Sequence, residues 1–388
     1  MAYPSFFSTE HTLGILGGGQ LGKMLLQCTR TWDIRTKVLD PDPQAPARLS
    51  CNEFVQGDLK DFDTVYAFGQ GCDVLTIEIE HVNTEALRKL KAEGVIVHPD
   101  PEALTQIKDK GLQKMFYQLH GLPSSDFALH DNEAGILHAL EKGLLKYPFV
   151  QKARTEGYDG RGVSIIRSEK DLDRLLPGPC LVEDCIDIQT EIAVIACRNA
   201  RGEVVCFDPV SMDVHPEANL LDLLLYPAPV SSEVAQQARE LAAQLIARFD
   251  ICGLLAVEFM VDRDNKVWIN EVAPRPHNSG HQTIESSVSS QYEQHLRGIL
   301  NLPLGSSRVK FPSAMVNLLG DEGYQGPVDY QGLEEVLGRE GVFVHLYGKT
   351  ITKPFRKMGH VTVTAATLEE AKQTAQWVKQ RIKVRSRS

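Results

Sequence analysis

The chain has 388 residues, of which 43% are hydrophobic and 24% charged, a composition typical of a folded protein with two or three domains. Its 41 Lys and Arg against 51 Asp and Glu leave a formal net charge of −10, which argues against a dedicated nucleic-acid-binding protein. No apolar run approaches the ~18 residues of a membrane span, and the eight cysteines have no CxxC spacing, so we expect a cytoplasmic protein with reduced thiols and no membrane partner.

The first part of the chain predicts a doubly wound parallel sheet over about residues 12–98. A short apolar strand runs into a glycine-rich turn and then a helix, and Gly17, Gly19 and Gly22 match G-x-G-x-x-G. Asp40 ends the next strand, where an acid could hold a ribose hydroxyl. The pattern requires only a tight turn whose amides approach an anion. An NAD site, another phosphate-bearing ligand and a purely structural turn therefore all fit it.

A second glycine-rich loop follows in the middle of the chain, after predicted helices at 102–120 and 132–142. Lys152 ends a strand and precedes Gly157-Tyr-Asp-Gly-Arg-Gly162, and a further strand begins at Val163. Glycines let backbone amides converge on phosphate oxygens, and a lysine adds a point charge beside them. The loop is a candidate phosphate site, although a solvated surface hairpin has similar residues.

Two glutamates lie in the stretch 255–273, which predicts a strand, a tight turn at 264–265 and a returning strand. Counting outward from the turn places Glu258 directly opposite Glu271. Facing carboxylates are destabilising unless a cation lies between them, and Mg²⁺ bound to nucleotide phosphates prefers such oxygen ligands. Strict alternation turns Asn270 to the opposite face of the hairpin. The alternative is that one glutamate simply faces solvent from an edge strand.

The last part of the chain, from about residue 308, predicts strands at 343–347 and 360–364 and a helix from Leu368. Its basic tail, residues 383–388, is expected to be frayed.

Three blocks, taken together and in this order, resemble the ATP-grasp superfamily and, within it, the N5-carboxyaminoimidazole ribonucleotide synthetase family. They are Gly157-Tyr-Asp-Gly-Arg-Gly162, then Asn270-Glu-Val-Ala-Pro-Arg-Pro-His-Asn-Ser-Gly-His281, then Tyr347-Gly-Lys349 with Arg356-Lys-Met-Gly-His360. The resemblance implies an α/β fold with three domains. These are an N-terminal doubly wound parallel-sheet domain (1–98), a central ATP-grasp α+β domain (99–307) and a small β-rich C-terminal domain (308–388) that completes the substrate site.

The resemblance also implies a role for each of several residue sets. ATP would be bound by Lys110, Lys152, Gly157, Gly160, Gly162, Glu183, Asp184, Cys185, Ile186, Glu191, His215, Asn270 and Glu271. Mg²⁺, or alternatively Mn²⁺, would be held by Glu258 and Glu271. The ribonucleotide substrate would be bound by Gln20, Leu21, Glu78, Asn278, Ser279, Lys349 and Arg356. Catalysis would involve Tyr158, Asp159, Arg161 and Lys353.

The activity that the resemblance implies is ATP-dependent carboxylation of 5-aminoimidazole ribonucleotide by bicarbonate. Carboxyphosphate would be the intermediate, ADP and phosphate would be released, and the enzyme would serve purine biosynthesis as a homodimer. Another ATP-grasp carboxylase or ligase with a different phosphorylated acceptor is the main alternative. A second alternative, an NAD-dependent oxidoreductase, is supported only by the first glycine turn and Asp40. A non-catalytic binding protein would have no use for two opposed glutamates.

Overall fold

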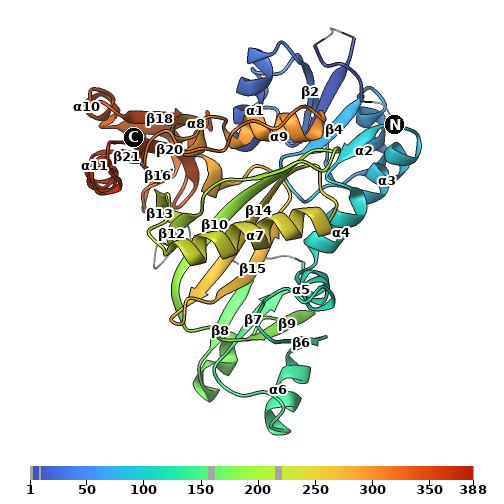
Figure 1. Ribbon diagram of the computed structural model, residues 1–388, viewed down its shortest axis with the longest axis vertical. Helices are drawn as coiled ribbons and strands as arrows, with labels where there is room; N and C mark the ends of the chain where they lie inside the picture. The colour runs from blue at the N-terminus through green and yellow to red at the C-terminus, as the bar shows by residue number, and fades with distance from the viewer. Residues whose placement is uncertain (1–2, 8–9, 156–161, 215–220, 388) are drawn as a thin grey trace.

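The computed structural model describes residues 3–7, 10–155, 162–214 and 221–387, and these are called the described residues below (Figure 1). Their strands form four sheets, and the three-part α/β architecture expected from the sequence is confirmed. Among the helices of the described residues, none is both long enough and apolar enough to cross a membrane. All eight cysteines are free.

The N-terminal domain is a five-stranded parallel sheet with the order β3-β2-β1-β4-β5. The strand order reverses between β1 and β4, and such a switch point leaves a crevice at the carboxyl ends of the strands. Strand β3 is short and partly exposed, and the sequence pattern did not reveal it. The elements are β1 (Thr12–Leu16), α1 (Gln20–Thr31), β2 (Arg35–Asp40), β3 (Glu53–Gln56), α2 (Phe62–Gly69), β4 (Val74–Ile77), α3 (Thr84–Ala92) and β5 (Ile96–His98).

The single helix predicted over 102–120 is two helices, α4 (Pro101–Lys108) and α5 (Lys110–Leu119). Asp109 between them has extended backbone, with φ −113° and ψ 110°, and its carboxylate accepts hydrogen bonds from the Gly111 and Leu112 amides. A short acidic side chain at this position is a favoured helix N-cap, so the break has a local cause. Arg154 holds the same carboxylate, with Nη2 2.6 Å from Oδ2.

A small antiparallel sheet with the order β6-β9-β7-β8 forms one end of the molecule (Figure 1). Lys152 on β7 pairs with Val163 on β8, so these two strands flank the second glycine-rich loop as predicted. The elements are β6 (Phe127–His130), α6 (Glu133–Glu141), β7 (Phe149–Ala153), β8 (Val163–Ile166), the 3₁₀ turn Glu169–Arg174 and β9 (Cys180–Asp184).

A large antiparallel sheet follows, with the order β15-β14-β10-β12-β13-β16-β20-β18 and with β11 paired to β10. Helix α7 packs on one face of β10 and β14 through an apolar core, and α9 lies between this sheet and α1 of the N-terminal domain. The elements are β10 (Ile188–Arg198), β11 (Val204–Cys206), β12 (Val210–Val214), β13 (Leu221–Tyr226), α7 (Ser232–Arg248), β14 (Gly253–Asp262), β15 (Val267–Ala273), the 3₁₀ turn Asn278–Gly280, α8 (Thr283–Ser286) and α9 (Gln291–Ile299).

The C-terminal part extends the large sheet, because β16 pairs with β13, and it also forms a separate three-stranded sheet with the order β19-β17-β21. The predicted frayed tail is wrong: β21 pairs with β17, and the Val384 side chain is 2% exposed. Alternation explains the error, since Val384 packs inward while its basic neighbours point outward. The elements are β16 (Ser313–Leu319), β17 (Gly326–Gln331), α10 (Leu333–Leu337), β18 (Val342–Leu346), β19 (Ile351–Thr352), β20 (Lys357–Thr364), α11 (Leu368–Arg381) and β21 (Lys383–Ser386).

His295 on α9 joins the N-terminal domain to the large sheet. Its Nε2 lies 3.1 Å from Thr76 Oγ1 on β4, and its Nδ1 accepts a hydrogen bond from the Leu254 amide on β14. Burial, with a smaller contribution from His98, lowers the pKa of His295 to about 3. Because this value lies below the unfolded value of 6.5, the neutral imidazole contributes stability above pH 6.5 that is lost as the pH falls toward 3.

We expect His295→Gln to reduce the loss of unfolding free energy that the protein undergoes as the pH falls. Between pH 6.5 and 4.5 the wild type should lose about 2–3 kcal/mol of unfolding free energy through this residue, and the variant should not. Urea unfolding at pH 7.5, 6.0 and 4.5 measures the difference. His138→Gln, at an exposed position of α6, is the matched control and should keep the wild-type pH dependence. Equal pH dependence of wild type and His295→Gln would contradict the assignment.

Candidate active site

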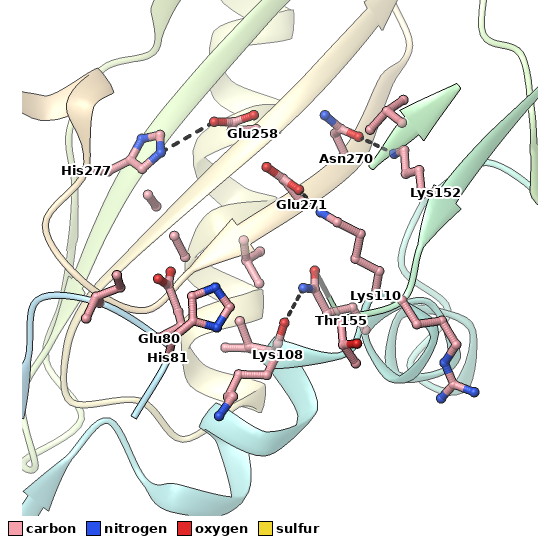
Figure 2. A pocket seen from close by; sticks show the side chains of 18 of the residues that line it. Glu80, His81, Lys108, Lys110, Lys152, Thr155, Glu258, Asn270, Glu271 and His277 are labelled. Atoms are coloured by element: carbon pink, nitrogen blue, oxygen red, sulfur yellow. Dashed lines mark hydrogen bonds and ion pairs between the residues drawn. The ribbon is translucent and has the colours of Figure 1, made fainter. Parts of the chain in front are cut away.

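A large cavity of about 2360 Å³ opens between the N-terminal domain, the small sheet and the large sheet. Most of the predicted site residues that the structure describes line it, although they lie far apart in the sequence. Figure 2 shows several of them pointing toward one another. The predicted residues that line the cavity are Gln20, Leu21, Glu78, Lys110, Lys152, Glu183, Asp184, Cys185, Ile186, Glu191, Glu258, Asn270, Glu271 and Asn278.

Other predicted residues lie elsewhere. Ser279 is buried, Lys353 is exposed, and neither lines the cavity. Lys349 Nζ donates to the Lys357 carbonyl, and the Arg356 guanidinium donates to the Ile351 carbonyl. Gly162 has φ +76°, which glycine adopts without strain, and is also absent from the cavity lining. Gly157, Tyr158, Asp159, Gly160, Arg161 and His215 lie outside the described residues.

Several residues that the sequence analysis did not select also belong to the site. Lys357, Arg275 and His277 line the cavity, and all three stand inside the sequence blocks that carried the family resemblance. Glu80 also lines it and pairs with Arg275, whose Nε lies 2.9 Å from the Glu80 carboxylate. No motif marked Glu80, because its position depends on how the N-terminal domain meets β15.

The two predicted glutamates face each other: Glu258 on β14 is the register partner of Glu271 on β15. The pairing nearer the turn differs from the prediction, because Phe259 pairs with Ile269 and Asn270 is therefore the extra residue of a β-bulge. The turn is correspondingly longer, with three residues, 263–265, between the Asp262 and Lys266 that hydrogen-bond across it.

The bulge corrects the prediction that Asn270 faces away from the site. Asn270 lines the same cavity as Glu271, and its Oδ1 accepts a hydrogen bond of 2.8 Å from Lys152 Nζ (Figure 2). A bulge places two residues of one strand opposite one residue of the other, so the alternation of side chains is interrupted there. Both Asn270 and Glu271 can therefore contact the same ligand.

The electrostatics of the glutamate pair favour a positive charge between the two carboxylates. Burial, followed by the neighbouring Glu271 and Glu191 carboxylates, raises the pKa of Glu258 to about 8. Burial would also raise the pKa of Glu271, but the Lys110 ammonium, which contacts its Oε2, outweighs burial and lowers it. The His277 ring lies 3.5 Å from Glu258. The raised pKa of Glu258 favours a proton on that carboxylate, and the Lys110 ammonium neutralises Glu271, so the two facing groups do not repel each other.

Two carboxylates are a small donor set for a metal ion. Within the part of the chain that the structure describes, no three His, Cys, Asp or Glu side chains gather as a metal site. Two carboxylates are nevertheless enough for Mg²⁺, because this ion commonly binds proteins through one or two carboxylates and takes its other ligands from phosphates and water. Glu258 and Glu271 could therefore hold Mg²⁺ or Mn²⁺ when a phosphate-bearing ligand occupies the cavity.

Two lysines contact another acidic group of this region. Glu183, at the end of β9, has a side chain that is 4% exposed, and its carboxylate contacts Lys152 at 2.6 Å and Lys114 at 2.9 Å. Both oxygens of the carboxylate are therefore paired with lysines. If Glu183 contacts the adenine, the contact must come from its backbone N–H or C=O group. Burial also raises the pKa of Glu191 on β10.

The first glycine turn already holds carboxylates of the protein itself. The Gly18 amide donates to Asp40 Oδ2 at 2.7 Å, and the Gly22 amide donates to the Glu78 carboxylate. Burial raises the pKa of Glu78 to about 7. In a dinucleotide site these amides would face the pyrophosphate, so their occupation by carboxylates argues against the NAD alternative.

Three family models match consecutive parts of the chain. Residues 10–108 match the ribonucleotide synthetase preATP-grasp domain, residues 115–292 the ATP-grasp domain, and residues 313–374 the phosphoribosylaminoimidazole carboxylase C-terminal domain. The chain spans only 66% of the length of the phosphoribosylaminoimidazole carboxylase of Candida glabrata, to which it is 35% identical over 95% of its own length.

Other relatives match over nearly their whole length. The N5-carboxyaminoimidazole ribonucleotide synthase of Synechococcus elongatus is 34% identical, with 93% of this chain and 92% of that protein covered. The crystal structure of the Thermotoga maritima N5-carboxyaminoimidazole ribonucleotide synthetase is 39% identical, with a TM-score of 0.90 over 97% of this chain and 100% of that one. The Aspergillus clavatus synthase, solved in complex with ADP and 5-aminoimidazole ribonucleotide, is 34% identical, with a TM-score of 0.87 over 96% and 98% of the two chains. This chain belongs to the N5-carboxyaminoimidazole ribonucleotide synthetase family.

Proposed function

We propose that this protein is an ATP-dependent carbon–nitrogen ligase that carboxylates 5-aminoimidazole ribonucleotide with bicarbonate. The products are N5-carboxyaminoimidazole ribonucleotide, ADP and phosphate, and the reaction belongs to purine biosynthesis. The observation that carries the proposal is one shared cavity: it is lined by the facing Glu258 and Glu271, by Lys152, and by Gln20 and Glu78 of the N-terminal domain. The Aspergillus clavatus relative, which binds both ADP and the ribonucleotide, supports it.

ATP lies, in this proposal, between the small sheet and the large sheet. The backbone of residues 183–186 at the end of β9 meets the adenine, and the buried Glu191 meets the ribose. Lys110 and Lys152 contact the phosphates, because both line the cavity and their ammonium groups contact Glu271 and Asn270, the two adjacent residues at the bulge (Figure 2). An ammonium beside a phosphate gives a charge-assisted hydrogen bond that also orients the transferring group.

Glu258 and Glu271 hold Mg²⁺ in the proposed complex, with Mn²⁺ as an alternative ion. When bound, the ion neutralises charge on the ATP phosphates and helps to align them for transfer. Lys110, which contacts Glu271 and lines the same cavity, would face the phosphates beside the ion. Lys152, which donates a hydrogen bond to Asn270, supplies a second positive charge beside the bulge.

The chemistry proceeds in two steps. A bicarbonate oxygen attacks the γ-phosphorus, the bond to the β-phosphate oxygen breaks, and ADP leaves with that electron pair. The exocyclic amine of the ribonucleotide then captures the carboxyl group of carboxyphosphate, phosphate leaves, and the amine loses a proton. Positioning and charge stabilisation supply most of the catalysis in such transfers. Tyr158, Asp159 and Arg161 are the residues predicted to orient the amine and move its proton. Lys353, which the sequence also predicted to be catalytic, is exposed and does not line the cavity, so no step is assigned to it.

The ribonucleotide lies at the carboxyl edge of the N-terminal sheet, against Gln20, Leu21 and Glu78, with Asn278 on the opposite side. Ser279, Lys349 and Arg356 remain predicted contacts. A homodimeric assembly and a cytoplasmic location complete the proposal and rest on the sequence alone; sedimentation of the purified protein tests the first.

The experiment that tests the proposed function is ADP release with the substrates varied one at a time. We expect ADP release to require Mg²⁺, bicarbonate and 5-aminoimidazole ribonucleotide together, and to be accompanied by stoichiometric carboxylated product. ADP release at the full rate without the ribonucleotide, or with a different phosphorylated acceptor, would favour the alternative ATP-grasp ligase.

Two neighbouring lysines give a sharper test of the acceptor site. Lys357 lines the cavity, whereas Lys353 is exposed. We therefore expect Lys357→Met to raise the KM for the ribonucleotide about tenfold or more, as loss of a charged hydrogen bond to a phosphate does, with a smaller change in the KM for ATP. Lys353→Met is the matched control, with less than about a threefold effect. A larger defect in Lys353→Met than in Lys357→Met would restore the assignment of Lys353.

A further inference from the structure

Lys114 on α5 is a buried lysine that does not line the large cavity. The residue is only 2% exposed to solvent. Nζ lies 2.7 Å from the Ser125 carbonyl oxygen, 3.0 Å from Ser125 Oγ and 2.9 Å from Glu183 Oε1. Its three N–H groups are therefore all used by the protein, and none points to a ligand. A lysine is seldom buried so completely unless its charge is paired.

Glu183 connects this buried lysine to the cavity. Its other oxygen, Oε2, lies 2.6 Å from Nζ of Lys152, and Ser125 Oγ lies 3.1 Å from Oε1. Burial alone would raise the pKa of Glu183, but attraction to Lys152 and Lys114 outweighs burial and lowers it, so the carboxylate is ionised at neutral pH. Lys152 reaches the cavity with its side chain 12% exposed.

The cluster of Lys114, Lys152 and Glu183 has little space for water on its buried side, around Lys114. A second, small cavity of about 10 Å³ lies among Lys110, Lys114, Lys152, Glu183 and their neighbours. This volume holds about one water molecule, so little water lies beside Lys114 to screen it from Glu183, whereas Lys152 and Glu183 also border the large cavity. The balance of charges within the cluster therefore determines the field that reaches the cavity.

The charge balance differs with and without Lys114. With both lysines present, one carboxylate is shared by two ammonium groups and the cluster has a net charge of about +1. Without Lys114, Glu183 would neutralise Lys152, and the cluster would present almost no net charge to an anion. Lys114 does not line the large cavity and so does not contact a nucleotide there. Its charge nevertheless changes how strongly Lys152 attracts the phosphates of a nucleotide.

We propose that Lys114 is a positioning residue of the nucleotide site: it compensates Glu183 from behind, so that Lys152 retains an unneutralised positive charge for the phosphates in the cavity. The inference rests on the proposed function in one respect, namely that the anion is ATP. It adds a role for Lys114 and for the side chain of Glu183, neither of which need contact the ligand.

The test compares ATP with adenosine, which lacks the phosphates. We expect Lys114→Met to weaken the binding of ATP in the presence of Mg²⁺ about tenfold, while the binding of adenosine stays within about twofold. Glu183→Gln should bind ATP at least as tightly as wild type. The double variant, Lys114→Met with Glu183→Gln, restores the net charge of the cluster and should recover ATP binding to within about threefold of wild type. Calorimetric titration measures all four proteins.

The control for removing a partly buried, ion-paired lysine is Lys37→Met, because Lys37 pairs with Glu53 in the N-terminal domain and does not line the cavity. It should leave ATP binding unchanged. Equal loss of ATP and adenosine binding in Lys114→Met, or no recovery in the double variant, would overturn the inference. If Lys114→Met does not fold, weaker ATP binding by Glu183→Gln would overturn it instead. Failure of the wild type to bind ATP would refute the proposed function, whereas binding by the wild type with an unaffected Lys114→Met would refute only this inference.

Discussion

Glu271→Gln is expected to lower the rate of ADP release about 100-fold or more while leaving the fold intact. The substitution keeps the shape of the side chain but removes one of the two facing carboxylates, and with it the charge that would hold Mg²⁺ against the phosphates. Loss of charge stabilisation in the transition state typically costs about two to three orders of magnitude in kcat. Steady-state ADP release at saturating Mg²⁺ and ATP measures the effect.

The fold should survive this change because a charge partner remains for Lys110. Glu258 lies opposite Glu271, and its pKa is raised partly by the Glu271 charge, so removing that charge favours ionised Glu258 beside Lys110. The urea midpoint should therefore stay close to that of the wild type. Glu240→Gln, at an exposed position of α7, is the matched control and should keep full activity. ADP release by Glu271→Gln within about threefold of wild type would contradict the metal assignment.

Lys152→Met is the second substitution with a large expected effect. Lys152 is the cavity-lining lysine that contacts both Glu183 and Asn270, and its removal takes away the charge that we assign to the phosphates. We expect kcat/KM for ATP to fall about 100- to 1,000-fold, with adenosine binding nearly unchanged. The protein should still fold, since Lys114 remains to pair with the buried Glu183 carboxylate.

Lys170→Met provides the control for this variant, because Lys170 is exposed in the same small-sheet region. It should leave kcat/KM for ATP within about twofold of wild type. If Lys152→Met lost ATP and adenosine binding equally, its role would be structural, and the assignment of Lys152 to the phosphates would be wrong.

The facing glutamates were predictable because they depend on local pattern alone. A hairpin with alternating apolar residues has few registers, and the turn residues limit them further. The prediction nevertheless reached Glu258 and Glu271 through pairing that is shifted by one residue near the turn, and the bulge at Asn270 compensated for the shift. A bulge has no clear sequence signal here, because Asn270 is neither a glycine nor flanked by one. The orientation of Asn270 was wrong for the same reason.

Other features depend on contacts between distant segments and could not be read from the sequence. Lys114 looks like an ordinary polar position of a helix, and only the approach of β9 turns it into a buried partner of Glu183. Lys357 and Lys353 are both basic residues of one segment, and the pairing of β20 with β16 and β18 decides which of them reaches the cavity. The basic tail was predicted to be frayed because the sequence does not show that residues 383–386 pair with β17.

We propose that one cavity transfers the γ-phosphoryl group of ATP to bicarbonate beside the ribonucleotide. The most direct measurement uses bicarbonate labelled with ¹⁸O, unlabelled ATP and 5-aminoimidazole ribonucleotide, with mass spectrometry of the released phosphate. Attack by a bicarbonate oxygen on the γ-phosphorus, followed by cleavage of the carbon–oxygen bond, leaves that oxygen on phosphorus, so each phosphate should carry one ¹⁸O atom. Phosphate without the label, with its new oxygen derived from water, would contradict the account.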